Sequence, residues 1–213
     1  GSTAIVSNSI PIGVGLAYSL KLAKKKSIVC IYIGDAAVEE GVFFESINFS
    51  ILKKLPVVFI CENNFFSVYT HLKDRQPPQR KIYKLAKAMG AISYKLKQDN
   101  PFKLFKKVKN IFDNVRKKPS THFIEIETCR YLEHCGPNDD SKLGYRSIKE
   151  LVKWKKKDPL VFSKNYLIKS KLINKKRIEI LDKKIINSIN KDFAYLKNLK
   201  KPQFKNINKL VYK

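Results

Sequence analysis

Two short apolar runs decide the fold: Ile28-Val29-Cys30-Ile31-Tyr32-Ile33-Gly34-Asp35 and, one helical segment later, Leu55-Pro56-Val57-Val58-Phe59-Ile60-Cys61-Glu62-Asn63-Asn64. Both runs are almost uninterrupted, which is typical of strands buried in a parallel sheet. Residues 39–54 between them show the apolar spacing of a helix. Because such a crossover is right-handed and returns a parallel strand, we expect the two polar ends to emerge at one carboxyl edge, where open α/β sheets bind ligands.

The polar residues at these strand ends suit a metal ion. Asp35 offers an anionic oxygen and Asn64 a neutral amide oxygen, and a nearby backbone carbonyl could provide a third ligand. Mg²⁺ prefers about six oxygen ligands, which usually include water and phosphate. We expect Gly34 to allow a sharp turn at the strand end. The residues alone therefore predict a magnesium–diphosphate site, and the alternative is a generic strand-helix-strand unit with solvated Asp35 and Asn64.

A longer pattern carries a family resemblance. The string from Gly34 to Phe49, followed by Lys54-Leu55-Pro56 and Cys61-Glu62-Asn63-Asn64, resembles the α subunits of the thiamine-dependent 2-oxo acid dehydrogenases that act on pyruvate, branched-chain 2-oxo acids or acetoin. The resemblance implies an α/β thiamine diphosphate-binding fold, with a mainly parallel sheet flanked by helices. It further implies a binding domain at residues 1–145 that lacks its amino-terminal part. A helical carboxyl-terminal extension at residues 146–213 is expected to pack on that domain or on a partner subunit.

The resemblance also assigns the cofactor site. It implies Mg²⁺ ligands at Asp35, Asn64 and the backbone oxygen of Phe66, with the amides of Ala36 and Ala37 near the diphosphate. The complete set of implied cofactor-binding residues is Ala4, Val6, Asp35, Ala36, Ala37, Asn64, Phe66, Arg130 and His134. Ala4 and Ala36 stand where the family often has Gly, and Phe66 stands where Tyr is common. Contacts made through the backbone tolerate these exchanges.

A third strand is expected at residues 121–128, and the loop after it resembles a cofactor-lining loop of the family. Arg130 and His134 match that loop, with Arg130 expected to fix it and His134, the catalytic candidate, to contact the diphosphate or shuttle protons. Leu132 and Glu133 depart from the pattern. Cys135 replaces a serine that is phosphorylated in animal enzymes, so we do not expect that regulation here.

The remaining segments are expected to surround this core. Residues 67–79 carry two prolines and favour a surface loop, in which His71 is expected to be solvated. We expect Asn8 or Ser9 to cap the first helix, and Ser147 with Glu150 to form a capping box. The other expected elements are helices at residues 11–22, 81–89, 101–118 and 160–199 and an edge strand at residues 92–96.

Composition weighs against other classes of protein. The net charge of +26 suggests a nucleic-acid surface, but only six of the 44 basic residues are Arg, which such surfaces favour for bidentate contacts. We interpret the lysines as solvated faces, which leaves a basic nucleic-acid-binding protein as a remote alternative. The four cysteines lack metal-site spacing and fit a reducing bacterial cytoplasm or, as a second choice, an organelle matrix. No apolar run is long enough to span a membrane.

The implied function is that of an α subunit of a thiamine diphosphate- and Mg²⁺-dependent 2-oxo acid dehydrogenase. Such an enzyme decarboxylates a pyruvate-like 2-oxo acid oxidatively and passes the acyl group to a lipoyl carrier. The expected partners are a β subunit in an α2β2-like assembly and a lipoyl-bearing acyltransferase, and the chain alone is expected to be inactive. An acetoin-cleaving or transketolase-like thiamine enzyme is the alternative.

Overall fold

The computed structural model describes residues 1–98 and 100–200 of the chain. Its main sheet has four parallel strands in the order β1 (Val29–Gly34), β2 (Val57–Asn63), β6 (Thr121–Glu127) and β5 (Ile92–Lys97). The predicted parallel strands, and the edge position of residues 92–96, are confirmed. The register pairs Gly34 with Glu62 and Asn63 with Glu127, so the polar strand ends do emerge at one edge.

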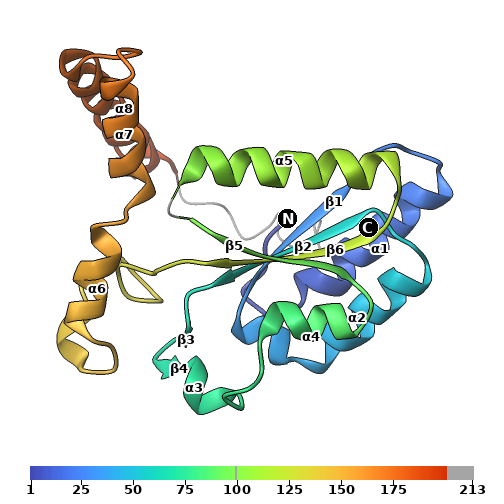
Figure 1. Cartoon of the computed structure of the whole chain (residues 1–213). Coiled ribbons are helices and arrows are strands. Elements are labelled where there is room, and N and C mark those ends of the chain that lie inside the picture. Colours follow the sequence, from blue (N-terminus) through green and yellow to red (C-terminus); the bar gives the residue numbers. More distant parts are fainter. Residues whose placement is uncertain (99, 201–213) are drawn as a thin grey trace. The chain divides into compact units, whose positions relative to one another are not determined.

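Helices cover both faces of this sheet, as Figure 1 shows. The alternation of side chains along β2 explains why, since Phe59 and its neighbours two residues away face one core and Val58 and Ile60 face the other. The first core is closed by α1 (Ser9–Leu22), α2 (Gly41–Leu52) and α4 (Ile82–Ala88). The second is closed by α5 (Pro101–Lys117), whose Ile111 and Val115 are buried. The predicted class, a mainly parallel sheet flanked by helices, is therefore confirmed.

Two segments differ from the sequence prediction. Residues 39–54 do not form one helix, because η1 (Ala36–Glu39) is a separate 3-10 turn and Glu40 is extended before α2 begins. Residues 67–79 are not only a surface loop. The antiparallel pair β3 (Phe66–Ser67) and β4 (Thr70–His71) leads into α3 (Leu72–Arg75), and Gln76 is buried. This segment folds back onto the edge of the sheet because its polar side chains find partners there, as described below.

The helix caps show where local patterns were reliable. Asn100 caps α5 by accepting a hydrogen bond from the Lys103 N–H at 3.0 Å. Asn8 and Ser147 occupy the N-cap positions of α1 and α6 (Ile148–Lys155), but neither side chain makes a capping hydrogen bond. The predicted capping box at Ser147 is therefore wrong. Gly90 follows α4 with a φ of +105°, a conformation that favours glycine at a helix end.

The chain divides into two compact units, Gly1–Phe162 and Ser163–Lys213. The first unit contains η2 (Ser141–Leu143) and α6, so the unit boundary falls later than the predicted domain boundary between residues 145 and 146. Residues 160–199 are largely helical as expected, and they form two helices, α7 (Pro159–Lys169) and α8 (Lys175–Asn198). In the second unit Lys164 pairs with Asp182 at 2.8 Å. None of the helices in the described ranges is long and apolar enough to cross a membrane.

Candidate functional site

Asp35 lies at the carboxyl edge of the sheet, immediately after β1, and its side chain is only 1% exposed. Burial raises the pKa of its carboxyl group, and the Arg75 guanidinium and the Asn64 backbone amide oppose part of that rise. Gly34 pairs with Glu62 in the parallel register, so the residues that follow β1 and β2 lie beside each other. The structure thus brings together two of the predicted metal ligands.

Arg75 supplies a positive charge to this edge. Its Nη2 pairs with Asp35, and its Nη1 lies 2.5 Å from Glu39 Oε1. Gln76 Nε2 donates to the same Glu39 oxygen at 2.6 Å. Because Arg75 ends α3 and Gln76 follows it, these contacts tie the segment after β2 to the turn after β1. A buried carboxylate needs such a partner, since an unpaired charge is costly away from water.

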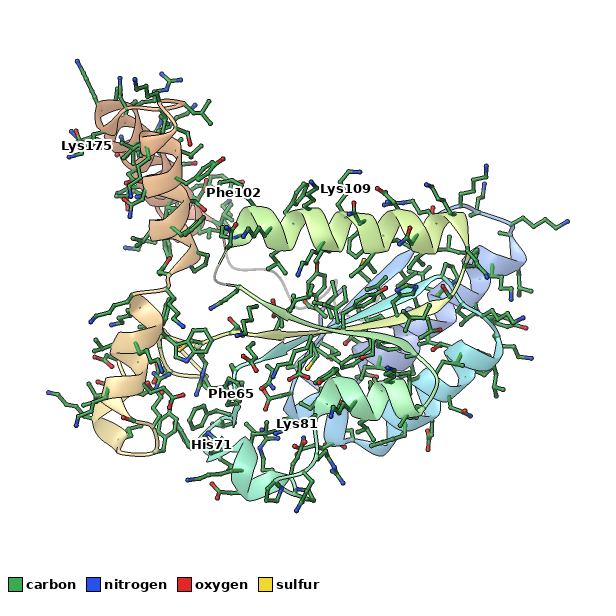
Figure 2. The ribbon with its side chains drawn as sticks, viewed as in Figure 1. Phe65, His71, Lys81, Phe102, Lys109 and Lys175 are labelled. Carbon is green, nitrogen blue, oxygen red and sulfur yellow. The ribbon has the colours of Figure 1, made fainter. Side chains whose placement is uncertain are left out.

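The turn after β2 is built from two asparagine side chains. Asn64 Oδ1 accepts from the Phe66 N–H at 2.8 Å, and Asn63 Oδ1 accepts from the Phe65 N–H at 3.0 Å. Phe65 takes a φ of +68°, which turns the chain sharply. His71, expected to be solvated, caps α3 by accepting from the Lys73 N–H at 3.0 Å. Figure 2 shows Phe65 and His71 on this turn, where their rings stack with centroids 6.5 Å apart.

Arg130 joins the loop after β6 to this turn. Its Nη2 donates to the Val68 carbonyl at 2.7 Å and to the Tyr145 hydroxyl at 3.0 Å. Its Nε and Nη1 atoms are buried and have no hydrogen-bond partner in the described part of the chain. Asn64, Phe66 and Arg130 line one small cavity. The loop-fixing contact expected of Arg130 is present, and two of its donors are unsatisfied.

A second arginine holds the loop from the other side. Arg146 pairs with the buried Asp140 and donates to the Tyr131 carbonyl at 3.1 Å. Asp140 also accepts a hydrogen bond from Tyr145. Burial, with the contribution of that hydrogen bond, raises the pKa of Tyr145 to about 12. These contacts order residues 130–146 into a fixed loop beside the site.

Other predicted residues lie away from this cluster or only partly within it. His134 is exposed, and no hydrogen bond within the described ranges links it to Asp35 or Asn64. Ala4 and Val6 are exposed, whereas Ala37 is buried. Ser7 Oγ donates to the Ala37 carbonyl at 2.9 Å, which anchors the first residues of the chain to the turn after β1.

The backbone at Gly34 differs from expectation. Its φ lies outside the positive range, so the strand end does not require glycine for its conformation. A Cβ at Gly34 would meet nothing within 4 Å, so the absent side chain leaves open space beside Asp35. The described residues contain no group of three or more His, Cys, Asp or Glu that could hold a metal. A metal here would need the amide and carbonyl oxygens of the turn.

Sequence reasoning missed Arg75, Glu39 and Glu125 as members of this region. Arg75 lies in a polar segment with prolines, which is typical of a solvated loop, and nothing in its local pattern indicates a buried contact. Glu125 lies between Ile124 and Ile126 inside a buried strand, and an acid at such a position was a signal that could have been used. A cleft of about 500 Å³ also opens beside Phe65 and Trp154, with lysines along its wall.

The comparisons with known proteins agree on one family. The family described as dehydrogenase E1 component matches residues 1–205. The chain is 30% identical over 185 residues to the pyruvate dehydrogenase E1 component subunit alpha of Rickettsia typhi, covering 87% of this chain and 56% of that protein. It is 29% identical over 169 residues to the 2-oxoisovalerate dehydrogenase subunit alpha of Bacillus subtilis, covering 79% of this chain and 50% of that protein.

The chain therefore spans between 56% and 64% of the length of its Rickettsia relatives. Among solved structures, benzoylformate decarboxylase from Polynucleobacter necessarius superimposes with a TM-score of 0.47 and 18% sequence identity. That superposition covers 60% of this chain and 24% of the other.

Proposed function

Because this chain belongs to the dehydrogenase E1 component family, we propose that it is the metal- and diphosphate-binding part of the α subunit of a 2-oxo acid dehydrogenase. The reaction is the oxidative decarboxylation of a pyruvate-like 2-oxo acid, with thiamine diphosphate and Mg²⁺ as cofactors. The observation that carries the proposal is the juxtaposition of the buried Asp35 with the Asn64–Phe66 turn at the carboxyl edge of the sheet.

The residues at this edge fit a metal-bound diphosphate. Asp35, the Asn64 amide oxygen and the Phe66 carbonyl are hard oxygen donors, which Mg²⁺ prefers. Arg75 pairs with Asp35 Oδ2 in this structure, so a metal ion would share the carboxylate with the guanidinium or displace it. The unsatisfied Arg130 donors suit an anion, and Arg130 lines the same small cavity as Asn64 and Phe66.

Each residue has a role in this proposal. Asp35, Asn64 and the Phe66 backbone oxygen would hold Mg²⁺, and the Ala36 and Ala37 amides would donate to the diphosphate. The backbone of Ala4 and Val6 would contact the aminopyrimidine ring. Arg130 would neutralise phosphate charge, and His134 would donate an imidazole N–H to a phosphate oxygen or carry a proton there. When bound, thiamine diphosphate supplies an electron sink for the carbon that loses CO₂.

The partners follow from the same proposal. A β subunit would complete the cofactor site in an α2β2-like assembly, and a lipoyl-bearing acyltransferase would accept the acyl group. The pyruvate dehydrogenase and 2-oxoisovalerate dehydrogenase relatives support a 2-oxo acid with a small side chain as substrate. The proposed location is the bacterial cytoplasm.

The test is an assay of the full-length chain co-expressed with its β subunit. Decarboxylation of pyruvate and of branched-chain 2-oxo acids is measured with and without thiamine diphosphate and Mg²⁺. We expect cofactor-dependent turnover that Asp35→Ala abolishes. Asp74→Ala is the matched control, because Asp74 is exposed on α3 in the same segment. Turnover that survives Asp35→Ala, or a loaded complex that decarboxylates no 2-oxo acid, would contradict the proposal.

A further inference from the structure

A buried carboxylate lies directly behind the turn that carries Asn64 and Phe66. Glu125 is on the central strand β6 and is only 4% exposed. No Lys or Arg of the described residues lies within ion-pair distance of it. Burying a charge without a cation is costly, so such a group persists only where hydrogen bonds hold it.

Both oxygens of Glu125 accept hydrogen bonds from N–H groups. Oε1 accepts from Asn63 Nδ2 at 2.9 Å, and Oε2 accepts from the Tyr83 backbone N–H at 2.9 Å. Tyr83 lies at the start of α4. Glu125 therefore joins the end of β2 to the beginning of a helix, and it matches two donors with two acceptors. A glutamine in its place would offer one acceptor only.

The Asn63 side chain links Glu125 to the turn after β2. Its Nδ2 is held by Glu125, so its Oδ1 points the other way and accepts from the Phe65 N–H at 3.0 Å. Its backbone carbonyl accepts from the Thr128 N–H at 2.9 Å. Asn63 is 2% exposed, so bulk water does not reach its side chain. The orientation of one amide therefore decides whether Phe65 keeps its left-handed conformation.

We propose that Glu125 is a positioning residue for the metal-binding turn: through Asn63 it fixes the conformation of the turn that carries Asn64 and Phe66. This inference rests on the proposed function, since it assumes that the turn binds a metal. Outer partners that orient a metal ligand typically change affinity about 10- to 100-fold when they are lost. Glu125 acts one residue farther away, through the backbone of the turn.

The direct test is Glu125→Gln in the full-length chain assembled with its β subunit. The introduced amide offers one oxygen to two donors. If that oxygen faces the Tyr83 N–H, the amide N–H meets the Asn63 amide N–H or forces that side chain to rotate, and if it faces Asn63, the amide N–H meets the Tyr83 N–H. In every case two donors meet, and the link from β2 to α4 through residue 125 loses a hydrogen bond. We expect the dissociation constant for Mg²⁺ with thiamine diphosphate, measured by isothermal titration calorimetry, to rise about 10-fold or more. The melting temperature is recorded beside it.

A double substitution separates positioning from simple loss of stability. When Asn63→Asp is combined with Glu125→Gln, the introduced amide N–H donates to the introduced carboxylate, which still accepts from the Phe65 N–H. The new glutamine keeps its oxygen for the Tyr83 N–H, so every partner is restored with unchanged net charge. We expect this double variant to recover affinity to within about 3-fold of the wild type. Asn63→Asp alone places two carboxylates together and is expected to bind as weakly as Glu125→Gln or more weakly.

Glu127→Gln is the matched control, because Glu127 lies on the same strand but pairs with Lys95. We expect wild-type affinity from it. If Glu125→Gln folds and binds the cofactor as the wild type does, or if the double variant fails to recover affinity while it remains folded, the inference is wrong. If the wild-type complex itself binds no Mg²⁺ with thiamine diphosphate, the proposed function fails instead.

Discussion

At the residue scale, the sequence predicted candidate metal ligands but not the residues that hold them in place. Asp35 and Asn64 could be predicted because each follows a strand whose apolar run ends abruptly, whereas Phe66 was predicted only from the family resemblance. Arg75 could not be predicted in this way, because it lies 40 residues from Asp35 in the sequence and only the folded chain brings the two side chains together. His134 stands apart in the structure because it lies on an exposed part of the loop after β6. Its predicted contact with the cofactor therefore stays a prediction.

Arg75→Gln tests the pairing at Asp35. Removing the guanidinium leaves a buried carboxylate without its cation, which typically costs about 3–5 kcal/mol in a buried pair. We expect chemical denaturation of the metal-free protein to show a lower unfolding free energy of that order. Arg80→Gln is the control, because Arg80 is exposed, and we expect no change from it. In the double variant Asp35→Asn with Arg75→Gln, a cost equal to the sum of the single costs would mean that the two residues are not coupled.

His122 gives a prediction about pH. It is buried on β6 with its Nδ1 unpartnered within the described ranges, and burial lowers its pKa from the ordinary value of 6.5. The unfolded chain therefore binds a proton at pH values where the folded chain does not. This contribution to stability is present above pH 6.5 and is lost as the pH falls through the lowered pKa.

We expect the melting temperature to fall between about pH 7.5 and pH 5, and to fall less in His122→Phe, which keeps a ring beside Tyr94. His134→Gln is the control, because His134 is exposed. Its melting temperature should change with pH as that of the wild type does. If the melting temperature of His122→Phe falls with pH as steeply as that of the wild type, His122 is not the cause of the fall.

At the scale of elements, hydrophobic periodicity predicted most of the fold. The strands at residues 29–34, 57–63 and 121–127 and the helix α5 follow directly from apolar spacing and from a capping Asn100. Local signals failed where contacts distant in sequence decide the outcome. Ser147 and Asn8 have capping side chains that do not cap, and the segment after β2 folds because Arg75 and Gln76 reach Asp35 and Glu39.

The packing of α1 on β1 can be tested with two glycines on the same helix. A Cβ at Gly13 would lie 2.6 Å from Cγ1 of the buried Ile31, whereas a Cβ at Gly15 would meet nothing within 4 Å. We expect Gly13→Ala to reduce the unfolding free energy by about 1–3 kcal/mol through overpacking. Gly15→Ala should increase it by about 0.5–1 kcal/mol through helix propensity. Equal effects in urea denaturation would refute the close approach of α1.

At the scale of the whole molecule, composition was the least informative guide. The net charge of +26 is spread over a chain in which 38 of 44 basic residues are lysines, and it did not indicate the family. The two units divide after Phe162, later than the predicted domain boundary. Arg130 joins the loop after β6 to the turn after β2, and α6 carries the buried Leu151. Sequence patterns do not reveal such contacts.

Truncation tests the division into units. Both hydrophobic cores of the first unit are built from residues before α6. A chain that ends at Phe162 should therefore keep a cooperative thermal transition by circular dichroism, with a midpoint close to that of the first unit in the longer chain. A chain that ends at residue 145, the predicted domain boundary, loses Arg146 and should melt lower. If the chain ending at Phe162 fails to fold, the first unit is not stable without the second.

The central claim is that Asp35 and the Asn64–Phe66 turn hold a metal ion against a diphosphate. The most direct measurement is electron paramagnetic resonance of Mn²⁺, used in place of Mg²⁺, with the full-length chain assembled with its β subunit. We predict a bound Mn²⁺ signal that requires thiamine diphosphate and is lost in Asp35→Asn, with Asp74→Asn unchanged. A bound signal that persists in Asp35→Asn, or no bound signal in the wild-type complex at saturating cofactor, would contradict the account.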